Sequence, residues 1–180
     1  MPESSKFCEN AVDVRRSRRR PHCILKEEDE GTIIKKIVSM CQDGLTIRDF
    51  PMKGRGIVAV KKFKSGEFVT EYRGDLIDMS EAKIREEILA SQNIEVSYMY
   101  YFQHNNASFC IDATNESESL GRLINHSRMH PNLTTRLKVV CGKPRLVFFA
   151  KKDIAEGTEL LYDYGDRRKI VQKFHPWLKC

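Results

Sequence analysis

The sequence has no long apolar run. Nowhere in its 180 residues is there a stretch close to the roughly 20 apolar residues that span a bilayer. Its first residues also lack the short apolar segment of a secretory signal peptide, so we expect neither a membrane anchor nor export. Hydrophobic residues make up 41% of the chain and charged residues 31%, which is typical of one soluble globular domain with a sizeable core.

Closely spaced cysteine pairs are also missing. The six cysteines are scattered, and no two have the Cys-x-x-Cys spacing: Cys8, Cys23, Cys41, Cys110, Cys141 and Cys180. This pattern argues against a small disulfide scaffold and against a zinc finger. We therefore expect reduced thiols in the cytosol or nucleus.

The glycine-rich segment KGRGIVAV, residues 53–60, lacks the features of a nucleotide-binding loop. It has no Gly-Lys-Ser/Thr ending, and it leads into an alternating strand instead of a helix, which excludes a Walker loop and a Rossmann fingerprint. Two interpretations remain. The segment is a tight hairpin turn, or its backbone approaches a ligand closely at Gly54 and Gly56, which carry no side chain.

The segment LINHSRMHPN, residues 123–132, contains two histidines but no hydrolase motif. A zinc hydrolase would place histidines on a helix beside a glutamate, whereas this segment has no glutamate and Pro131 disfavours a helix. A serine nucleophile would need a Gly-x-Ser-x-Gly elbow, which is absent. On the residues alone, a buried His126 held by backbone hydrogen bonds is the better interpretation.

Positive charge is concentrated in residues 1–30. The net charge is +6, and RRSRRR supplies five arginines ahead of the acidic segment KEEDE: Arg15, Arg16, Arg18, Arg19 and Arg20. We interpret residues 1–30 as a flexible, solvated arm that also serves as a nuclear-localisation signal or a phosphate-contacting patch. These interpretations are compatible, because a mobile arm can bind DNA.

The remaining pattern predicts a β-rich α+β domain. Apolar residues at helical spacing predict a helix in residues 31–44, with Thr32 as its N-cap and Gly44 as its stop. A second helix is predicted over residues 80–92, with Ile84 and Ile88 on one face. Alternating segments predict strands at 45–50, 56–63, 67–72, 98–103, 108–113, 144–154 and 158–164, with a hairpin turn at HNNA.

All six tyrosines lie in these predicted strands or at their ends: Tyr72, Tyr98, Tyr100, Tyr101, Tyr162 and Tyr164. Tyr162 and Tyr164 are two residues apart, so on a strand they share one face. That face is either half buried with its hydroxyls in water, or it lines a narrow slot with polar tips. Such a slot suits a long aliphatic chain that ends in an amine.

The order of the motifs resembles the SET-domain protein lysine methyltransferases over residues 45–180. The segments that carry the resemblance are KGRGIVAVKKFKSGEFVTEYRGDLI, YMYYF, GRLINHS with its following PN, and IAEGTELLYDYGD. EYRGDLI, YMYYFQ, LGRLINHS, ELLYDYGDR and PWLK resemble the branch that monomethylates lysine 20 of histone H4. The resemblance implies a SET domain at 45–166, with a C-terminal pseudoknot that brings INHS against LLYDYG. Residues 167–180 would then close the cofactor site.

The resemblance also implies an S-adenosylmethionine site and a channel for the target lysine. The cofactor-binding residues that match by motif are Lys53, Gly54, Arg55, Tyr98, Arg122, Asn125, His126 and Trp177. Tyr164 and Tyr72 match the catalytic positions, and Tyr162 and Tyr101 match the lysine channel. A tyrosine at position 162 implies a monomethyl product. Many members carry a zinc-binding cysteine cluster after the last motif, and because Cys180 stands alone we expect no metal.

Methyl transfer to lysine requires alignment more than it requires a base. Only a neutral amine can attack, and a desolvated channel beside a sulfonium lowers the lysine pKa from about 10.4. Proton loss to water is then sufficient, and the protein aligns and polarises the reacting groups.

The partners that follow are the histone H4 tail, the nucleosome, and nucleosomal DNA through the arginine-rich arm. We expect a monomer located in the nucleus on chromosomes. Two alternatives stay open: a methyltransferase for a non-histone protein, and a catalytically silent chromatin-binding module. The segment RMHPNLTTRL departs from the histone H4 branch, and its PN resembles the wider family.

Overall fold

The structure is a computed structural model that describes residues 28–94 and 98–164. The predictions for the arginine-rich arm and for Trp177 therefore lie outside the described residues. Within those residues, no helix is both long enough and apolar enough to cross a membrane.

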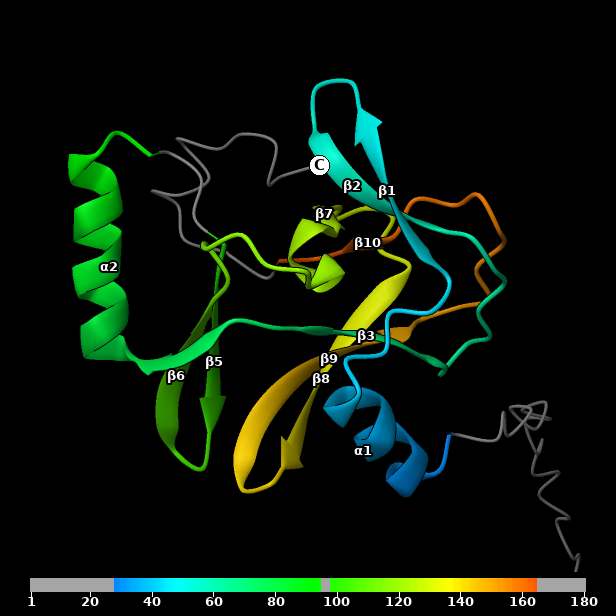
Figure 1. Cartoon of the computed structure of the whole chain (residues 1–180), viewed down its shortest axis with the longest axis horizontal. Coiled ribbons are helices and arrows are strands. Elements are labelled where there is room, and N and C mark those ends of the chain that lie inside the picture. The colour runs from blue at the N-terminus through cyan, green and yellow to red at the C-terminus, as the bar shows by residue number, and fades with distance from the viewer. Residues whose placement is uncertain (1–27, 95–97, 165–180) are drawn as a thin grey trace, which may run out of the picture.

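The described residues form short strands and two α-helices, as the α+β prediction expects (Figure 1). In chain order the elements are α1 (Glu30–Val38), β1 (Leu45–Phe50), β2 (Gly54–Ala59), β3 (Phe68–Tyr72), β4 (Asp75–Asp78), α2 (Met79–Ser91), β5 (Met99–His104), β6 (Ala107–Asp112), the 3-10 helix η1 (Leu120–Leu123), β7 (Asn125–His126), β8 (Leu133–Val140), β9 (Lys143–Ala150) and β10 (Leu161–Tyr162).

The strands form four small sheets, with the orders β1–β2, β10–β7, β3–β9–β8 and β4–β6–β5. Figure 1 shows the β10–β7 pair near the centre, between the β1–β2 hairpin and the β3–β9–β8 sheet. Helix α2 lies at one side, beside β4–β6–β5. The main core is enclosed by these elements and contains Phe63, Phe148, Ile57, Ile124 and Leu160, all less than 2% exposed.

The central pair joins segments that are distant in sequence. It is parallel, with Leu161 opposite Asn125 and Tyr162 opposite His126. All other strand pairs among the described residues are antiparallel. The INHS and LLYDYG segments therefore lie side by side, as the resemblance implies.

The segment before β10 is held on its other side as well. The backbone N–H of Leu160 donates to the carbonyl of Ile57 in β2 at 2.8 Å. The side chain of Asn132 donates to the carbonyl of Glu159 at 2.7 Å and accepts from the N–H of Leu161 at 2.8 Å. The chain thus passes between β2 and the segment around INHS, and this crossing places its last described residues at the centre of the domain.

Helix α1 begins earlier and ends earlier than the pattern predicts. The N-cap is Asp29, whose carboxylate accepts the N–H of Thr32 at 3.2 Å, so the prediction of Thr32 as N-cap is wrong. The Asp29 carboxylate, three residues ahead of Thr32, satisfies that N–H group. Its negative charge also interacts favourably with the positive end of the helix dipole. The helix ends at Val38 because Met40 adopts a positive φ of 54°. Ile33 and Ile37 are the residues that α1 buries.

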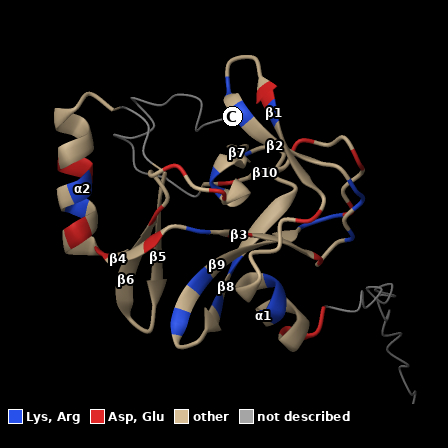
Figure 2. Cartoon of the chain, viewed as in Figure 1, with Lys and Arg blue, Asp and Glu red and all other residues tan. Residues whose placement is uncertain are grey.

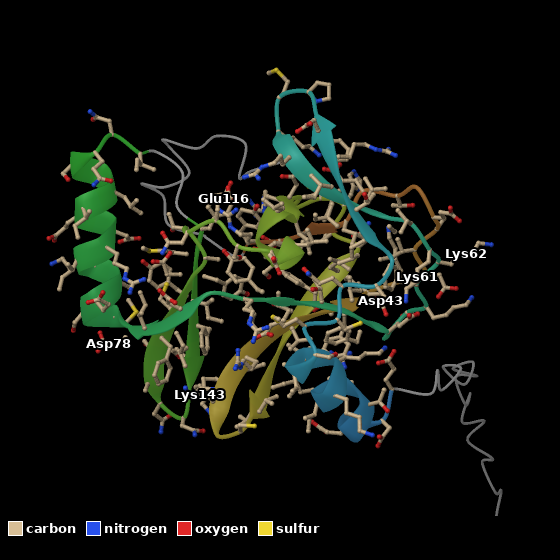
Figure 3. All side chains as sticks on the ribbon, in the orientation of Figure 1. Asp43, Lys61, Lys62, Asp78, Glu116 and Lys143 are labelled. Carbon is tan, nitrogen blue, oxygen red and sulfur yellow. The ribbon has the colours of Figure 1, made fainter. Side chains whose placement is uncertain are left out.

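Helix α2 matches its prediction in length but not in its apolar face. Asp78, labelled in Figure 3, caps the helix by accepting from the N–H of Glu81 at 2.9 Å. Arg85 fastens the helix to β6 through Asp112 at 2.8 Å. Ile84 and Ile88 are 53% and 50% exposed, so their shared face does not enter the core. Figure 2 shows charges of both signs along α2.

Three strands, β4, β7 and β8, were not among the predictions. Strand β8 pairs with β9 from Leu133 opposite Ala150 to Val140 opposite Lys143. In the turn between them, Cys141 and Gly142 both adopt positive φ. A glycine at such a position is a feature of hairpin turns that can be read from the sequence. Figure 2 shows basic residues on this hairpin.

Candidate active site

Five aromatic side chains from distant segments meet beside the β10–β7 pair. This aromatic cluster consists of Tyr72 of β3, Tyr100 of β5, Phe148 of β9, Tyr162 of β10 and Tyr164 just beyond it. The ring centroids of Tyr162 and Tyr164 are 4.6 Å apart, and those of Phe148 and Tyr162 are 4.7 Å apart. The ring of Tyr100 lies 5.7 Å from that of Tyr72 and 6.3 Å from that of Tyr162. These are ordinary separations for packed aromatic pairs, so the cluster is a single packed unit.

Three of the four tyrosines predicted for catalysis and the lysine channel belong to this cluster, and the fourth does not. Tyr72, Tyr162 and Tyr164 are brought together, whereas the hydroxyl of Tyr101 donates to Glu86 of α2 at 2.7 Å. Neighbouring residues on a strand point to opposite faces, so Tyr100 faces the cluster where Tyr101 was expected. The sequence signal that identifies Tyr100 is its spacing of two from Phe102, which also packs against the core.

The hydroxyl groups of the cluster differ in their hydrogen bonds. Tyr72 donates to the carbonyl of Tyr98 at 2.7 Å, and Tyr164 donates to the carbonyl of Ile124 at 3.0 Å. The hydroxyl of Tyr162 makes no hydrogen bond to any residue that the structure describes, although the side chain is only 4% exposed. A buried hydroxyl can both donate and accept, so Tyr162 keeps this capacity for a ligand.

The same burial keeps the tyrosines neutral. Desolvation raises the pKa of Tyr72, Tyr162 and Tyr164 above its ordinary value of 10, and the neighbouring tyrosines raise it further. At physiological pH these side chains therefore act as uncharged donors and acceptors. None of them is a tyrosinate base.

His126 holds Tyr164 from the adjoining strand. Its Nδ1 accepts the backbone N–H of Tyr164 at 3.1 Å, and the two ring centroids are 4.9 Å apart. Because Nδ1 accepts this bond, it carries no proton. His130 is exposed, and its backbone N–H donates to Ser127 at 3.0 Å. Among the described residues there is also no group of three or more His, Cys, Asp or Glu side chains arranged to hold a metal.

The glycine-rich segment, residues 53–60, starts in the turn of the β1–β2 hairpin and continues as strand β2. Met52 and Gly54 adopt positive φ values of 71° and 72° there, which confirms the hairpin interpretation. Gly56 lies against the side chain of Asn125, and a Cβ at this position would overlap Asn125 Nδ2 and come within 2.8 Å of Phe50. The close approach at Gly56 is thus to the INHS segment, whereas Gly54 has nothing within 4 Å of its Cβ direction.

An acidic residue that sequence reasoning missed joins two of the predicted cofactor-binding residues. The carboxylate of Glu159 lies 2.9 Å from Lys53 Nζ and accepts from Asn125 Nδ2 at 3.0 Å. Glu159 belongs to the ELLYDYG segment, so its presence was visible in the sequence. Its contacts depend on the pseudoknot crossing and have no local signal.

A second acidic residue, Glu116, joins the two predicted arginines. Glu116, labelled in Figure 3, lies 2.5 Å from Arg55 and 3.0 Å from Arg122. Its hydrogen bonds to Arg55 and Arg122 hold the pKa of the Glu116 carboxyl below its ordinary value. Arg122 is 3% exposed, lies 4.0 Å above the ring of Tyr98 and donates to the carbonyl of Ala113 at 2.7 Å. Arg122 is therefore a buried framework residue that supports the ring of Tyr98.

The described site thus has two parts that share the INHS segment. One part is the aromatic cluster with neutral hydroxyls, held by His126 and by the backbone of Ile124. The other is a polar region around Lys53, Asn125 and Glu159. This arrangement can place a polar ligand beside a narrow aromatic wall, which suits the alignment of two substrates better than proton transfer by a charged base.

Comparisons with known proteins point to one family. Residues 54–165 match the family model of the SET domain. The chain is 46% identical over 166 residues to N-lysine methyltransferase KMT5A-A of Danio rerio, and 50% identical over 165 residues to Histone-lysine N-methyltransferase Set8 of Drosophila pseudoobscura pseudoobscura. Each alignment covers 92% of this chain but only 48% and 24% of the relative, so the chain spans about half or less of their length.

A solved structure, that of CpSET8 from Cryptosporidium, resembles the fold with a TM-score of 0.71. It is 40% identical in sequence, and the match covers 82% of this chain and 71% of that one. Together with the matched family model, the parallel β10–β7 pair and the tyrosine cluster, this shows that the chain belongs to the SET-domain family.

Proposed function

We propose that this protein is an S-adenosylmethionine-dependent histone lysine methyltransferase that monomethylates lysine 20 of histone H4. The observation that carries the proposal is the hydroxyl of Tyr162, which has no hydrogen-bond partner among the described residues although the residue is only 4% exposed. The names of the relatives support the reaction class and the histone substrate.

The polar part of the site fits the cofactor. The amino-acid end of S-adenosylmethionine carries both charges and is complementary to Lys53, Arg55, Asn125 and Glu159. The open space at Gly54 leaves room beside this set, because nothing lies within 4 Å of its Cβ direction. His126 and Asn125 would hold the cofactor from the INHS segment, next to Tyr98, whose ring is supported by Arg122.

The aromatic cluster performs the alignment. When bound, S-adenosylmethionine supplies a methyl group on a positively charged sulfur. Buried aromatic walls desolvate the lysine amine and so lower its pKa from about 10.4, because burial disfavours the charged form. The neutral hydroxyls and backbone carbonyls of the cluster then orient the amine lone pair, and the proton leaves to water.

Tyr162 limits the product to one methyl group. Its hydroxyl can hydrogen-bond the lysine amine or a water beside it. Phe148 and Tyr164 pack against its ring at 4.7 and 4.6 Å and restrict its movement on their sides. A monomethylated amine would have to turn its methyl toward this wall in order to react again.

Residues outside the described ranges complete the proposal. The five arginines of the arm, residues 15–20, would contact nucleosomal DNA, and Trp177 would close the cofactor site. A protein with these partners would act in the nucleus on chromosomes. DNA contacts by all five arginines would steepen the dependence of log affinity on log salt by about 4.5, since each neutralised phosphate contributes about 0.9.

The proposal is tested by transfer of label from S-adenosylmethionine to nucleosomes, free histones and nuclear extract in parallel. We expect label on histone H4 in nucleosomes, and little or none with Tyr164→Phe, which loses the bond to the Ile124 carbonyl. Nucleosome binding without label would favour a silent chromatin module. Label only in the extract would favour a non-histone substrate, and either result would overturn the proposal.

A further inference from the structure

Tyr100 occupies a position in the aromatic cluster that no motif assigns. Its ring packs against two tyrosines of the predicted site, with centroid distances of 5.7 Å to Tyr72 and 6.3 Å to Tyr162. The ring is nearly parallel to that of Tyr162, at an interplanar angle of 28°. Tyr100 therefore contacts Tyr162 from β5, while Phe148 contacts Tyr162 from β9.

The hydroxyl of Tyr100 is anchored by a residue on strand β8. It lies 3.1 Å from Thr135 Oγ1 of β8, within hydrogen-bond distance. Thr135 is the strand partner of Phe148, so the anchor and the ring that packs on Tyr162 share one position in the β8–β9 ladder. This hydrogen bond ties β5 to the β3–β9–β8 sheet across the aromatic cluster.

The consequence for Tyr162 follows from its own hydrogen bonding. Its hydroxyl has no partner among residues 28–94 and 98–164, so no protein hydrogen bond in that range fixes the orientation of its ring. The ring is positioned by packing alone, and Tyr100 and Phe148 provide two of its walls. Closely packed side chains transmit displacement, so a Tyr100 ring that can move lets the Tyr162 ring move as well.

We propose that Tyr100, anchored by Thr135, is a positioning residue for product specificity: it holds Tyr162 where a second methyl group cannot be accommodated. The inference rests on the proposed lysine methyltransferase activity. In a second transfer, the lone pair of the monomethylated amine forms a new N–C bond while the S–C bond breaks, and the resulting ammonium loses its proton to water. This requires space for the first methyl group beside Tyr162, which the Tyr100–Thr135 anchor withholds.

Three variants test the anchor, a fourth tests the Tyr100 ring itself, and a fifth serves as a control. Tyr100→Phe and Thr135→Val each remove the hydrogen bond and nearly keep the side-chain shape, and the double variant removes the same bond only once. Tyr100→Ala removes the wall itself. Thr134→Val is the matched control, because Thr134 is the neighbour on β8 and is the strand partner of Phe149.

The readout is the ratio of dimethyl to monomethyl product on a histone H4 tail peptide, measured by mass spectrometry, with thermal melting of each variant. We expect a rise of about fivefold for Tyr100→Phe and Thr135→Val, the equivalent of about 1 kcal/mol for one neutral hydrogen bond. The double variant should show no larger rise than either single one, since the bond is shared. Tyr100→Ala should exceed both, and Thr134→Val should match the wild type.

An unchanged ratio in Tyr100→Phe and Thr135→Val, with melting temperatures near that of the wild type, would overturn the inference. Additive effects in the double variant would do so as well, because they would mean that the two side chains act separately. Failure of the proposed activity is distinguishable, since the wild-type protein would then transfer no methyl group to the peptide. If Tyr100→Ala does not fold, the two conservative variants still decide the question.

Discussion

Replacing Tyr162 by phenylalanine removes a single oxygen atom from the centre of the aromatic cluster. The ring keeps its neighbours Phe148 and Tyr164 at 4.7 and 4.6 Å. Because the hydroxyl bonds to no described residue, its removal leaves no group of the described residues unpaired. We therefore expect Tyr162→Phe to change the free energy of unfolding by less than about 1 kcal/mol, in contrast to the larger cost of orphaning a buried partner.

The effect on the product should be larger. The lost hydroxyl removes about 1 kcal/mol of hydrogen bonding to the amine or its water, which corresponds to about a fivefold change in the rate of a second transfer. The space that the oxygen occupied becomes available to the first methyl group, and this steric term adds to the same change. Tyr162→Phe should therefore convert a monomethylating protein into one that yields dimethyl-lysine.

The assay is a time course on two histone H4 tail peptides, one unmodified and one already monomethylated at lysine 20, with products resolved by mass spectrometry. The wild type should leave the monomethylated peptide almost unchanged, whereas Tyr162→Phe should convert it. A folded Tyr162→Phe protein that still stops at one methyl group would refute the reasoning. It would mean that another side chain limits the product.

Three further predictions concern the cofactor region and the cluster. Gly56→Ala should weaken S-adenosylmethionine binding and lower stability by about 1–3 kcal/mol, since the added methyl overlaps Asn125; calorimetry and thermal melting that match the wild type would contradict this. Glu159→Gln should weaken S-adenosylmethionine binding about fivefold, because Lys53 and Asn125 lose a shared charged partner. The free energy of unfolding should change by less than about 1 kcal/mol, because the ion pair of Lys53 and Glu159 is partly exposed. Unaltered affinity would exclude a role for the carboxylate. Burial raises the pKa of Tyr72, Tyr162 and Tyr164, so the folded state keeps protons that the unfolded chain loses near pH 10. The free energy of unfolding should therefore fall by up to about 4 kcal/mol per pH unit above that pH, with no contribution from these groups below about pH 9. Urea unfolding from about pH 8 to 11 measures this slope, and a flat curve would show that the tyrosines ionise freely.

Local patterns predict the elements whose signals are themselves local. The strand at 45–50 matches β1, and the HNNA turn joins β5 to β6 with Asn105 and Asn106 at positive φ. The helix caps are harder to predict, because Asp29 and Thr32 both suit an N-cap and the choice depends on which one reaches an unpaired N–H group.

The contents of the site depend on contacts that no local pattern encodes. Alternation predicts that Tyr100 and Tyr101 face opposite sides, but only the packing of β5 against β6, α2 and the core decides which side is the cluster. Glu159 meets Lys53 and Asn125 only because the chain crosses between β2 and β7. The resemblance supplied Tyr72, Tyr162 and Tyr164, since the order of motifs carries the fold with it.

Transfer of a methyl group to one lysine of the nucleosome tests the central claim most directly. Recombinant nucleosomes would carry either unmodified histone H4 or histone H4 in which lysine 20 is replaced by arginine, and both would be incubated with the protein and labelled S-adenosylmethionine. The account predicts label on unmodified histone H4, recovered as monomethyl-lysine at position 20, and none on the replaced histone. Equal labelling of both nucleosomes, or no labelling of either, would contradict it.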